Sequence, residues 1–258
     1  MTVNDRGGQS GWIVPPYGPD DGDTYVGMVA YLPTSLGGPL SINPPQPGNT
    51  PNFLYAPTTH GPNGNCLETT TAYENTGSGT VAQVEWYDFC LGANGGWGNT
   101  AASIDSYFRD NYLRVFSNEA SGEPEYTSEV KRLSDGRWHG FIYNYGASQW
   151  VDYYDSQGTF TNFGDGEGWN MFETHYANAL SNPQPDYCSY VPTISSEGFR
   201  LKNASQGWHL VGSSEVETWE QYYNGSQPQD CWGSPSEHTY YATSYNLGND
   251  TLWQVFSY

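Results

Sequence analysis

Short runs of alternating polar and apolar or aromatic residues, separated by turn residues, recur along most of this chain. A period of two residues is typical of β-strands, and regular short strands indicate an antiparallel sandwich or barrel. We expect strands at 24–32, 52–56, 66–74, 81–90, 126–133, 137–145, 149–154, 168–176, 194–203, 207–212, 215–222, 238–246 and 251–257. There is no linker and no internal repeat, so the pattern predicts one all-β domain over residues 24–258, after an irregular Gly-, Pro- and Asp-rich arm over residues 1–23.

One segment departs from the period of two. Residues 101–114 carry Ile104, Phe108 and Tyr112 at helical spacing, after a loop expected over 92–99. The spacing predicts a helix there. The alternative is a long loop followed by a strand at 112–116.

The strand around Glu68 carries two carboxylates on one side. Glu68, Thr70, Ala72 and Glu74 share one face, because successive side chains on a strand point to opposite faces. A solvated outer face is the plain explanation, since charged residues are mostly exposed. The other explanation is a functional face, and a second strand of the same character favours it.

That second strand surrounds Glu173. Trp169, Met171, Glu173 and His175 share one of its faces. A carboxylate flanked by Trp, Met and Phe should be partly desolvated, which makes it a candidate acid or base. A salt-bridged glutamate at the rim of the sheet is the alternative.

The charge balance narrows the possible partners. The net charge is −20, with 28 acidic residues against 8 Lys plus Arg. Such a surface repels phosphate, so we expect neither a nucleic-acid nor a membrane partner. A chain so rich in carboxylates keeps its charge modest at low pH, which suits a protein that works in acid.

Cysteine usage favours secretion. The four cysteines have no C-x-x-C spacing, and we expect Cys66–Cys90 and Cys188–Cys231 disulfides because each pair is local. Glycosylation sequons begin at Asn203, Asn224 and Asn249. The N-terminal residues lack the apolar stretch of a signal peptide.

Familiar catalytic motifs are missing from the sequence. It contains no G-x-S-x-G, no H-E-x-x-H, no phosphate-binding glycine loop and no histidine pair at metal-ligand spacing. Carboxylates and aromatic residues remain. They fit a carboxylate-dyad hydrolase, a glycan lyase or glycosidase, or a carbohydrate-binding sandwich.

The order of several short motifs resembles the glutamic peptidases of the eqolisin and neprosin types. Leu67-Glu68-Thr69 is similar to the eqolisin Leu-Gln-Thr, with Glu in place of the catalytic Gln as in neprosin-like enzymes. Phe172-Glu173-Thr174-His175 falls where the family has Ala-Glu-Trp-Ile, whose Glu is catalytic. The other similar segments are Tyr25–Ala30, Val84–Tyr87, Phe141–Asn144, Gln149–Val151, Val191-Pro192 and Gly198–Ala204.

The resemblance implies a secreted acid endopeptidase, built as an antiparallel two-sheet β-sandwich of the concanavalin-like jelly-roll kind. It implies a dyad in which Glu173 is the general base and Glu68 polarises the substrate carbonyl. Tyr55, Trp86, Thr70 and His175 would bind substrate, and Glu74 and Glu85 are alternatives to Glu68. We expect a monomer with a polypeptide substrate, no cofactor and no metal. The rival hypothesis is a carbohydrate-binding or glycan-active β-sandwich.

Overall fold

The computed structural model describes the chain in separate segments. They are residues 6–14, 27–33, 53–61, 65–75, 80–92, 95–114, 125–157, 168–176, 194–203, 207–211, 215, 217–223, 245–246 and 251–255. Side chains are described over 58–61, 65–72, 81–92, 95–114 and 125–157, and at 168–170, 196, 199–202, 207–211 and 215.

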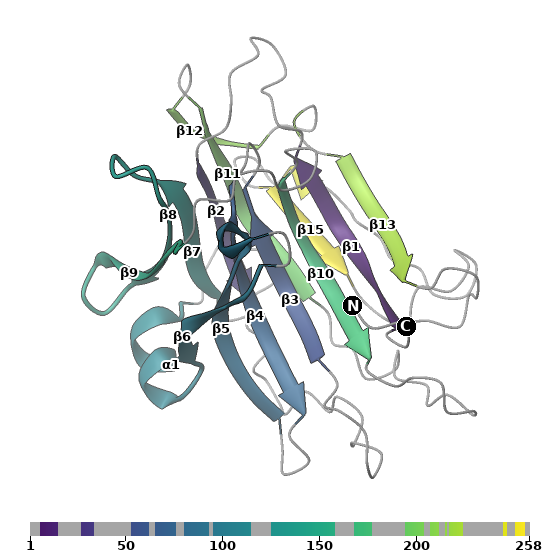
Figure 1. The fold of residues 1–258 in the computed structure, drawn as a ribbon, viewed down its shortest axis with the longest axis horizontal. Coiled ribbons are helices and arrows are strands. Elements are labelled where there is room, and N and C mark those ends of the chain that lie inside the picture. The colour runs from purple at the N-terminus through teal and green to yellow at the C-terminus, as the bar shows by residue number, and fades with distance from the viewer. Residues whose placement is uncertain are drawn as a thin grey trace.

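The described strands form two antiparallel sheets, which we name sheet I and sheet II (Figure 1). Sheet I has the order β13-β1-β10-β3-β4-β5-β6. Its strands are β13 (Glu217–Tyr223), β1 (Arg6–Val14), β10 (Gly168–Tyr176), β3 (Phe53–His60), β4 (Leu67–Asn75), β5 (Thr80–Asp88) and β6 (Trp97–Ser103).

Sheet II has the order β14-β15-β11-β2-β7-β8-β9, with β12 paired to β11. Its strands are β14 (Tyr245–Asn246), β15 (Thr251–Val255), β11 (Ile194–Asn203), β2 (Gly27–Pro33), β7 (Glu125–Arg132), β8 (Trp138–Asn144), β9 (Gln149–Asp155) and β12 (Gly207–Leu210). A short 3-10 helix, η1 (Phe89–Leu91), and one α-helix, α1 (Ser106–Tyr112), complete the described elements.

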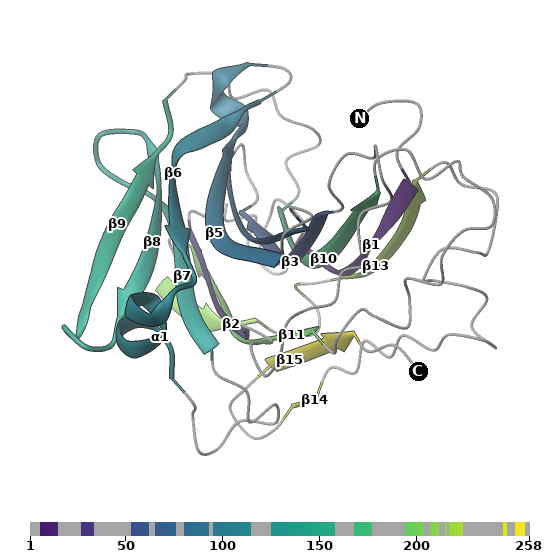
Figure 2. The same cartoon turned by 90° about the horizontal axis from the view of Figure 1, so that it is seen from below.

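The two sheets pack face to face and enclose the core. Figure 2 shows sheet I curving so that its concave face is turned away from sheet II. The largest fully buried side chains are Leu67, Trp86, Tyr126, Ile142 and Phe199, which come from both sheets. The Trp86 indole fits because Gly140 on β8 has no side chain: a Cβ there would overlap the indole ring. The fold is therefore an antiparallel β-sandwich, as the sequence predicts.

Two predictions for individual segments are wrong. Residues 6–14 belong to the expected arm, but they form β1, which lies between β10 and β13 inside sheet I. Residues 97–99, expected in a loop, and residues 101–103, expected in a helix, form part of β6. Both segments are rich in small residues and lack clear alternation, and backbone pairing with neighbouring strands determines their conformation.

Two other differences concern the ends of elements. The helix expected over 101–114 is present but shorter, at Ser106–Tyr112, because the Asp105 side chain caps it by accepting from Phe108 N at 2.9 Å. The strand expected at 52–56 extends to His60 through Pro57. A register shift between Tyr55 and Thr58 marks a bulge there, where a residue without an N–H is tolerated.

The strands expected at 66–74, 126–133, 137–145, 149–154, 168–176 and 194–203 are confirmed within a few residues. Most of the strand expected at 238–246 lies outside the described residues. None of the described helices has the length and apolar character needed to cross a membrane.

Candidate functional site

Glu68 lies on β4, on the concave face of sheet I. Its neighbours in register are Tyr87 on β5 and His60 on β3, and His60 in turn pairs with Trp169 on β10. Directly opposed residues of antiparallel strands share a face, so these four residues form one row across the sheet. The row faces away from sheet II, because residues on the other face of β4 and β5 contact that sheet: Thr71 is hydrogen-bonded to Tyr126, and the Trp86 indole packs over Gly140.

Glu68 is buried although it is on the outer face. Only 8% of the residue is exposed. The plain explanation of a solvated outer face is therefore wrong for Glu68.

Aromatic rings line the row around this carboxylate. His60 stacks on Trp169 with the ring centroids 4.1 Å apart, and Phe89 meets His60 edge to face at 5.5 Å. Phe89 also contacts Tyr87 at 4.7 Å, and Tyr87 contacts Trp97 at 4.9 Å. These rings form a continuous cluster from β10, β3, η1, β5 and β6, and Glu68 on β4 lies between His60 and Tyr87 in the same row.

The charge of Glu68 acts on Tyr87. Burial raises the pKa of the Tyr87 hydroxyl, and the negative charge of Glu68 raises it further. A phenol with a raised pKa keeps its proton at acidic and neutral pH, so Tyr87 remains a potential hydrogen-bond donor beside Glu68.

Two buried threonines form the next row on the same face. Thr70 on β4 pairs with Thr58 on β3, and neither residue is exposed. Neither Oγ1 atom has a hydrogen-bond partner among the described residues. A buried hydroxyl without a partner is costly, so this row holds two unsatisfied polar groups. The expected role of Thr70 in substrate binding stays a prediction, because the residue is not exposed.

Glu173 lies in the third row of the concave face. It pairs with Tyr55 on β3, and Tyr55 pairs with Ala72 on β4, two positions beyond Thr70. At ordinary strand spacing, Glu68 and Glu173 are about 13 Å apart along the strands and about 10 Å across them. Their Cα atoms would be about 16 Å apart in a flat sheet. The register thus places both glutamates on one face without making them direct neighbours.

The remaining candidates occupy other register positions on the same face. His175 pairs with Phe53, and Phe53 pairs with Glu74, in the fourth row. By strand spacing, the Glu74 Cα lies about 12 Å from that of Glu173. The side chains of Tyr55, Glu74, Glu173 and His175 lie outside the described part of the structure.

Glu85 lies on the concave face, because it pairs with Thr70. Its carboxylate accepts a hydrogen bond from the Gln83 side chain. Trp86 does not line this face. It pairs with Thr69, is fully buried between the sheets and stacks on Tyr153 at 5.4 Å. Trp86 is a core residue, which corrects its expected role in substrate binding.

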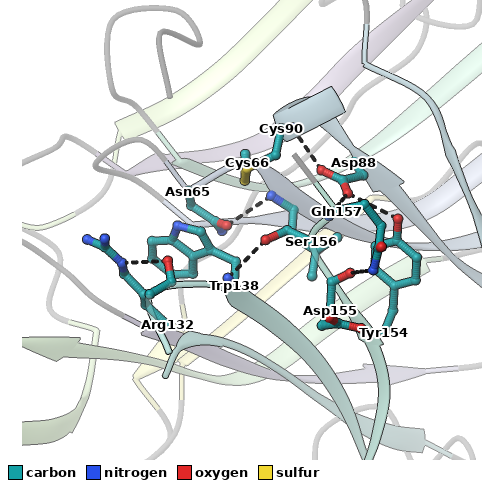
Figure 3. Close-up of a disulfide and its surroundings, with 12 residues drawn as sticks. Asn65, Cys66, Asp88, Cys90, Arg132, Trp138, Tyr154, Asp155, Ser156 and Gln157 are labelled. Atoms are coloured by element: carbon teal, nitrogen blue, oxygen red, sulfur yellow. Dashed lines mark hydrogen bonds between the residues drawn. A yellow bond between two sulfur atoms is a disulfide. The ribbon is translucent and has the colours of Figure 1, made fainter. Parts of the chain in front are cut away.

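A disulfide and a buried carboxylate hold the end of the row in place (Figure 3). Cys66, next to the start of β4, is joined to Cys90 in η1, as the sequence predicts. Asp88, fully buried, accepts hydrogen bonds from Cys90 N at 2.8 Å, from the Tyr154 hydroxyl at 3.0 Å and from Gln157 N. These contacts fix η1 to β4 and to β9 of sheet II.

Cys66, Asp88 and Cys90 also lie close enough together to suggest a metal site. The two sulfurs are joined to each other, so they offer no thiolate ligands. The expected Cys188–Cys231 disulfide lies outside the described residues.

The site residues predicted from the sequence do not include His60, Tyr87, Phe89, Trp97 or Trp169. The signal for Tyr87 was available, since a hairpin that pairs Asn75 with Thr80 also pairs Glu68 with Tyr87. The pairing of β3 with β10 joins segments about a hundred residues apart, and local pattern does not reveal it.

A scan against models of protein families and a search of curated proteins found no match. Among solved structures, the chain is similar to Scytalido-glutamic peptidase with a peptide based transition state analog. That match covers 100% of both chains, with a TM-score of 0.44 and 11% identity. A second structure of this peptidase, with a transition state analog inhibitor, matches over 83% of this chain and 96% of that one, with a TM-score of 0.35 and 11% identity.

A third match is SCP-B, a member of the Eqolisin family of peptidases, in a complex with the tripeptide Ala-Ile-His. It covers 86% of this chain and 98% of that one, with a TM-score of 0.37 and 10% identity. At these identities, the chemistry of this chain has to be inferred from its own residues.

Proposed function

We propose that this protein is a secreted acid endopeptidase that hydrolyses peptide bonds with Glu68 and Glu173. The observation that supports this most directly is the register of β4, β3 and β10, which puts positions 68 and 173 on one concave face. The burial of Glu68 among aromatic rings adds to it, because a desolvated carboxyl in a lined site is typical of an acid or base.

In the proposed reaction, the substrate backbone crosses β3 between the two glutamates. Glu173, ionised, takes a proton from water, and the water oxygen attacks the scissile carbonyl carbon. Glu68, protonated, donates a hydrogen bond to the developing oxyanion and then transfers its proton to the leaving nitrogen. Figure 2 shows that sheet I is curved, with this face on its concave side.

The pH dependence of cleavage tests this assignment. Carboxylic acids ordinarily lose their proton near pH 4, and the mechanism needs one carboxyl protonated and one ionised. We therefore expect cleavage of a denatured protein below about pH 5 and little at neutral pH. Mass spectrometry of digests made at several pH values measures this. An optimum at neutral or alkaline pH contradicts the proposal.

Glu→Gln variants identify the residues. Glu173→Gln loses the proton acceptor and should lower kcat/KM on the order of 10³-fold or more. Glu68→Gln keeps a donor for the oxyanion and should lose about 10²-fold. Glu74→Gln and Glu85→Gln, on the same face, are matched controls and should stay within a few-fold of the parent.

The control variants also show which glutamate acts together with Glu173. A large loss in Glu74→Gln together with full activity in Glu68→Gln would transfer the acid role to Glu74. Full activity in Glu173→Gln would refute the proposal itself.

The second candidate is a carbohydrate-binding or glycan-active protein. Trp97, in the aromatic cluster beside Glu68, favours this candidate. The residue is 46% exposed, and sugars also stack on exposed aromatic rings. Saturable binding or cleavage of an oligosaccharide, without any cleavage of polypeptide, would select it.

A further inference from the structure

An exposed apolar wall borders Glu68 on the β5–β6 side. We define it as Tyr87, Phe89, Leu91 and Trp97. Leu91 is 50% exposed and Trp97 is 46% exposed, while large apolar residues elsewhere in the described sheets are mostly buried. Trp97 pairs with Tyr87 across the strands, so it lies on the same face as Glu68. The wall is thus continuous with the candidate acid.

The wall is held rigidly from behind. Asp88 and Gly96 exchange backbone hydrogen bonds at 2.8 and 3.0 Å, and the Cys66–Cys90 disulfide ties η1 to β4. Gly95 has φ +58°, and a Cβ there would clash with the Tyr87 ring. A Cβ at Gly96 would press against the Leu91 methyl group at 3.0 Å. The close packing of this hairpin therefore fixes the apolar residues before any ligand binds.

Its chemistry indicates what it would hold. The four side chains offer rings and methyl groups, with the Tyr87 hydroxyl and the Trp97 indole N–H as their polar groups. Exposed apolar surface that is rigid and adjoins a reactive group favours an apolar ligand, because burial is gained without ordering the site.

We propose that the apolar wall is a specificity subsite that takes an aromatic or large aliphatic side chain of the peptide substrate, on the Glu68 side of the scissile bond. This proposal rests on the proposed function, because a subsite for a substrate side chain requires that the protein cleaves peptides. The experiment below separates its failure from the failure of that function.

The first arm measures cleavage at about pH 4. Two series of peptides are used, one for each residue that flanks the cleaved bond. Within a series, that residue is either Phe or Ala. The parent should cleave the preferred Phe peptide faster than the Ala peptide, and Trp97→Ala should reduce kcat/KM for the Phe peptide on the order of tenfold. It should leave the Ala peptide within about twofold. Trp150→Ala, which removes an exposed indole from β9 of sheet II, is the matched control and should change neither.

The outcomes of this arm are distinct. Equal loss on both peptides, or no loss in Trp97→Ala, overturns the subsite and leaves the peptidase proposal standing. Partial rescue by Trp97→Phe, with selectivity for Phe restored, supports the subsite.

The second arm needs no catalysis. An N-acetylated, C-amidated tripeptide with central Phe is titrated into Glu173→Gln while tryptophan fluorescence is followed, with the Ala tripeptide and a β-linked glucose hexasaccharide as comparisons. If Glu173→Gln binds the Phe tripeptide and the Glu173→Gln/Trp97→Ala double variant does not, the result supports the subsite even if no polypeptide is cleaved. Trp97-dependent binding of the hexasaccharide, or no binding of any probe, overturns it.

Discussion

The Asp88 side chain links the two sheets beside the row that contains Glu68. The carboxylate is fully buried and accepts from three donors, two of which belong to or follow β9 on the opposite sheet. It therefore joins the two sheets at the end of the row that contains Glu68.

Asp88→Asn tests this link. The amide NH₂ would face donors, and at least one hydrogen bond would be lost in a buried place. We expect a loss of about 1–3 kcal/mol in the free energy of unfolding. Urea denaturation measures it, and Asp110→Asn on the exposed side of α1 is the matched control, expected to change little. Equal stability of Asp88→Asn and the parent would mean that the hydrogen bonds contribute nothing net.

Alternation along a single strand predicts the positions of some site residues but not of others. Alternation along β4 correctly placed Glu68 opposite Leu67 and Thr69, because a period of two is a local property. Alternation along β4 alone does not place Trp86, whose face follows from the hairpin that pairs Asn75 with Thr80 and Thr69 with Trp86. His60 joined the site through its pairing with Trp169, more than a hundred residues away in the chain.

At the scale of elements, the Cys66–Cys90 disulfide links the start of β4 with η1. The bridge closes a segment of 24 residues, and such cross-links stabilise by about 2–4 kcal/mol, chiefly by restricting the unfolded chain. We expect the Cys66→Ser/Cys90→Ser double variant to lose about that amount in urea denaturation. Under reducing conditions the parent should approach the variant. Alkylation of Cys66 and Cys90 in the untreated, folded protein would show that the bridge is absent.

Elements differed in how well they could be predicted. The hairpin of β7 and β8 has clear alternation and an Asp135-Gly136 turn, in which Gly136 has φ +86°, so local chemistry suffices. β1 and β6 have small residues and weak alternation, and their partners decide their conformation. Pro57 ended the predicted strand early because a bulge is a property of the pair and not of one strand.

For the whole molecule, a net charge of −20 makes stability respond to pH. Most of that response should favour acid, where repulsion between carboxylates falls. Asp135 acts in the opposite direction. A hydrogen bond from the Arg137 backbone N–H, then one from the His139 side chain, hold the pKa of the Asp135 carboxyl below its usual value.

A lowered pKa in the folded state contributes stability above the pKa of the unfolded chain, and this contribution is lost as the pH falls through the folded value. Asp135→Asn should therefore be less stable than the parent at about pH 7 and nearly equal to it at about pH 2. Urea denaturation at both values measures the difference. A gap that widens toward acid would contradict the assigned direction.

The order of strands in sheet I means that the two candidate glutamates are assembled by different routes. β3, β4, β5 and β6 follow one another in the chain and pair as a meander, whereas β10 lies between β3 and β1, and β1 between β10 and β13. A nascent chain can form the Glu68 side early, from near neighbours. The Glu173 side must wait for residues 168–223 to emerge and find the first strand, and long-range pairing of this kind is slow. The junction between β3 and β10 therefore closes after the meander of β3 to β6, and any proteolytic activity would first appear once β10 has paired with β3.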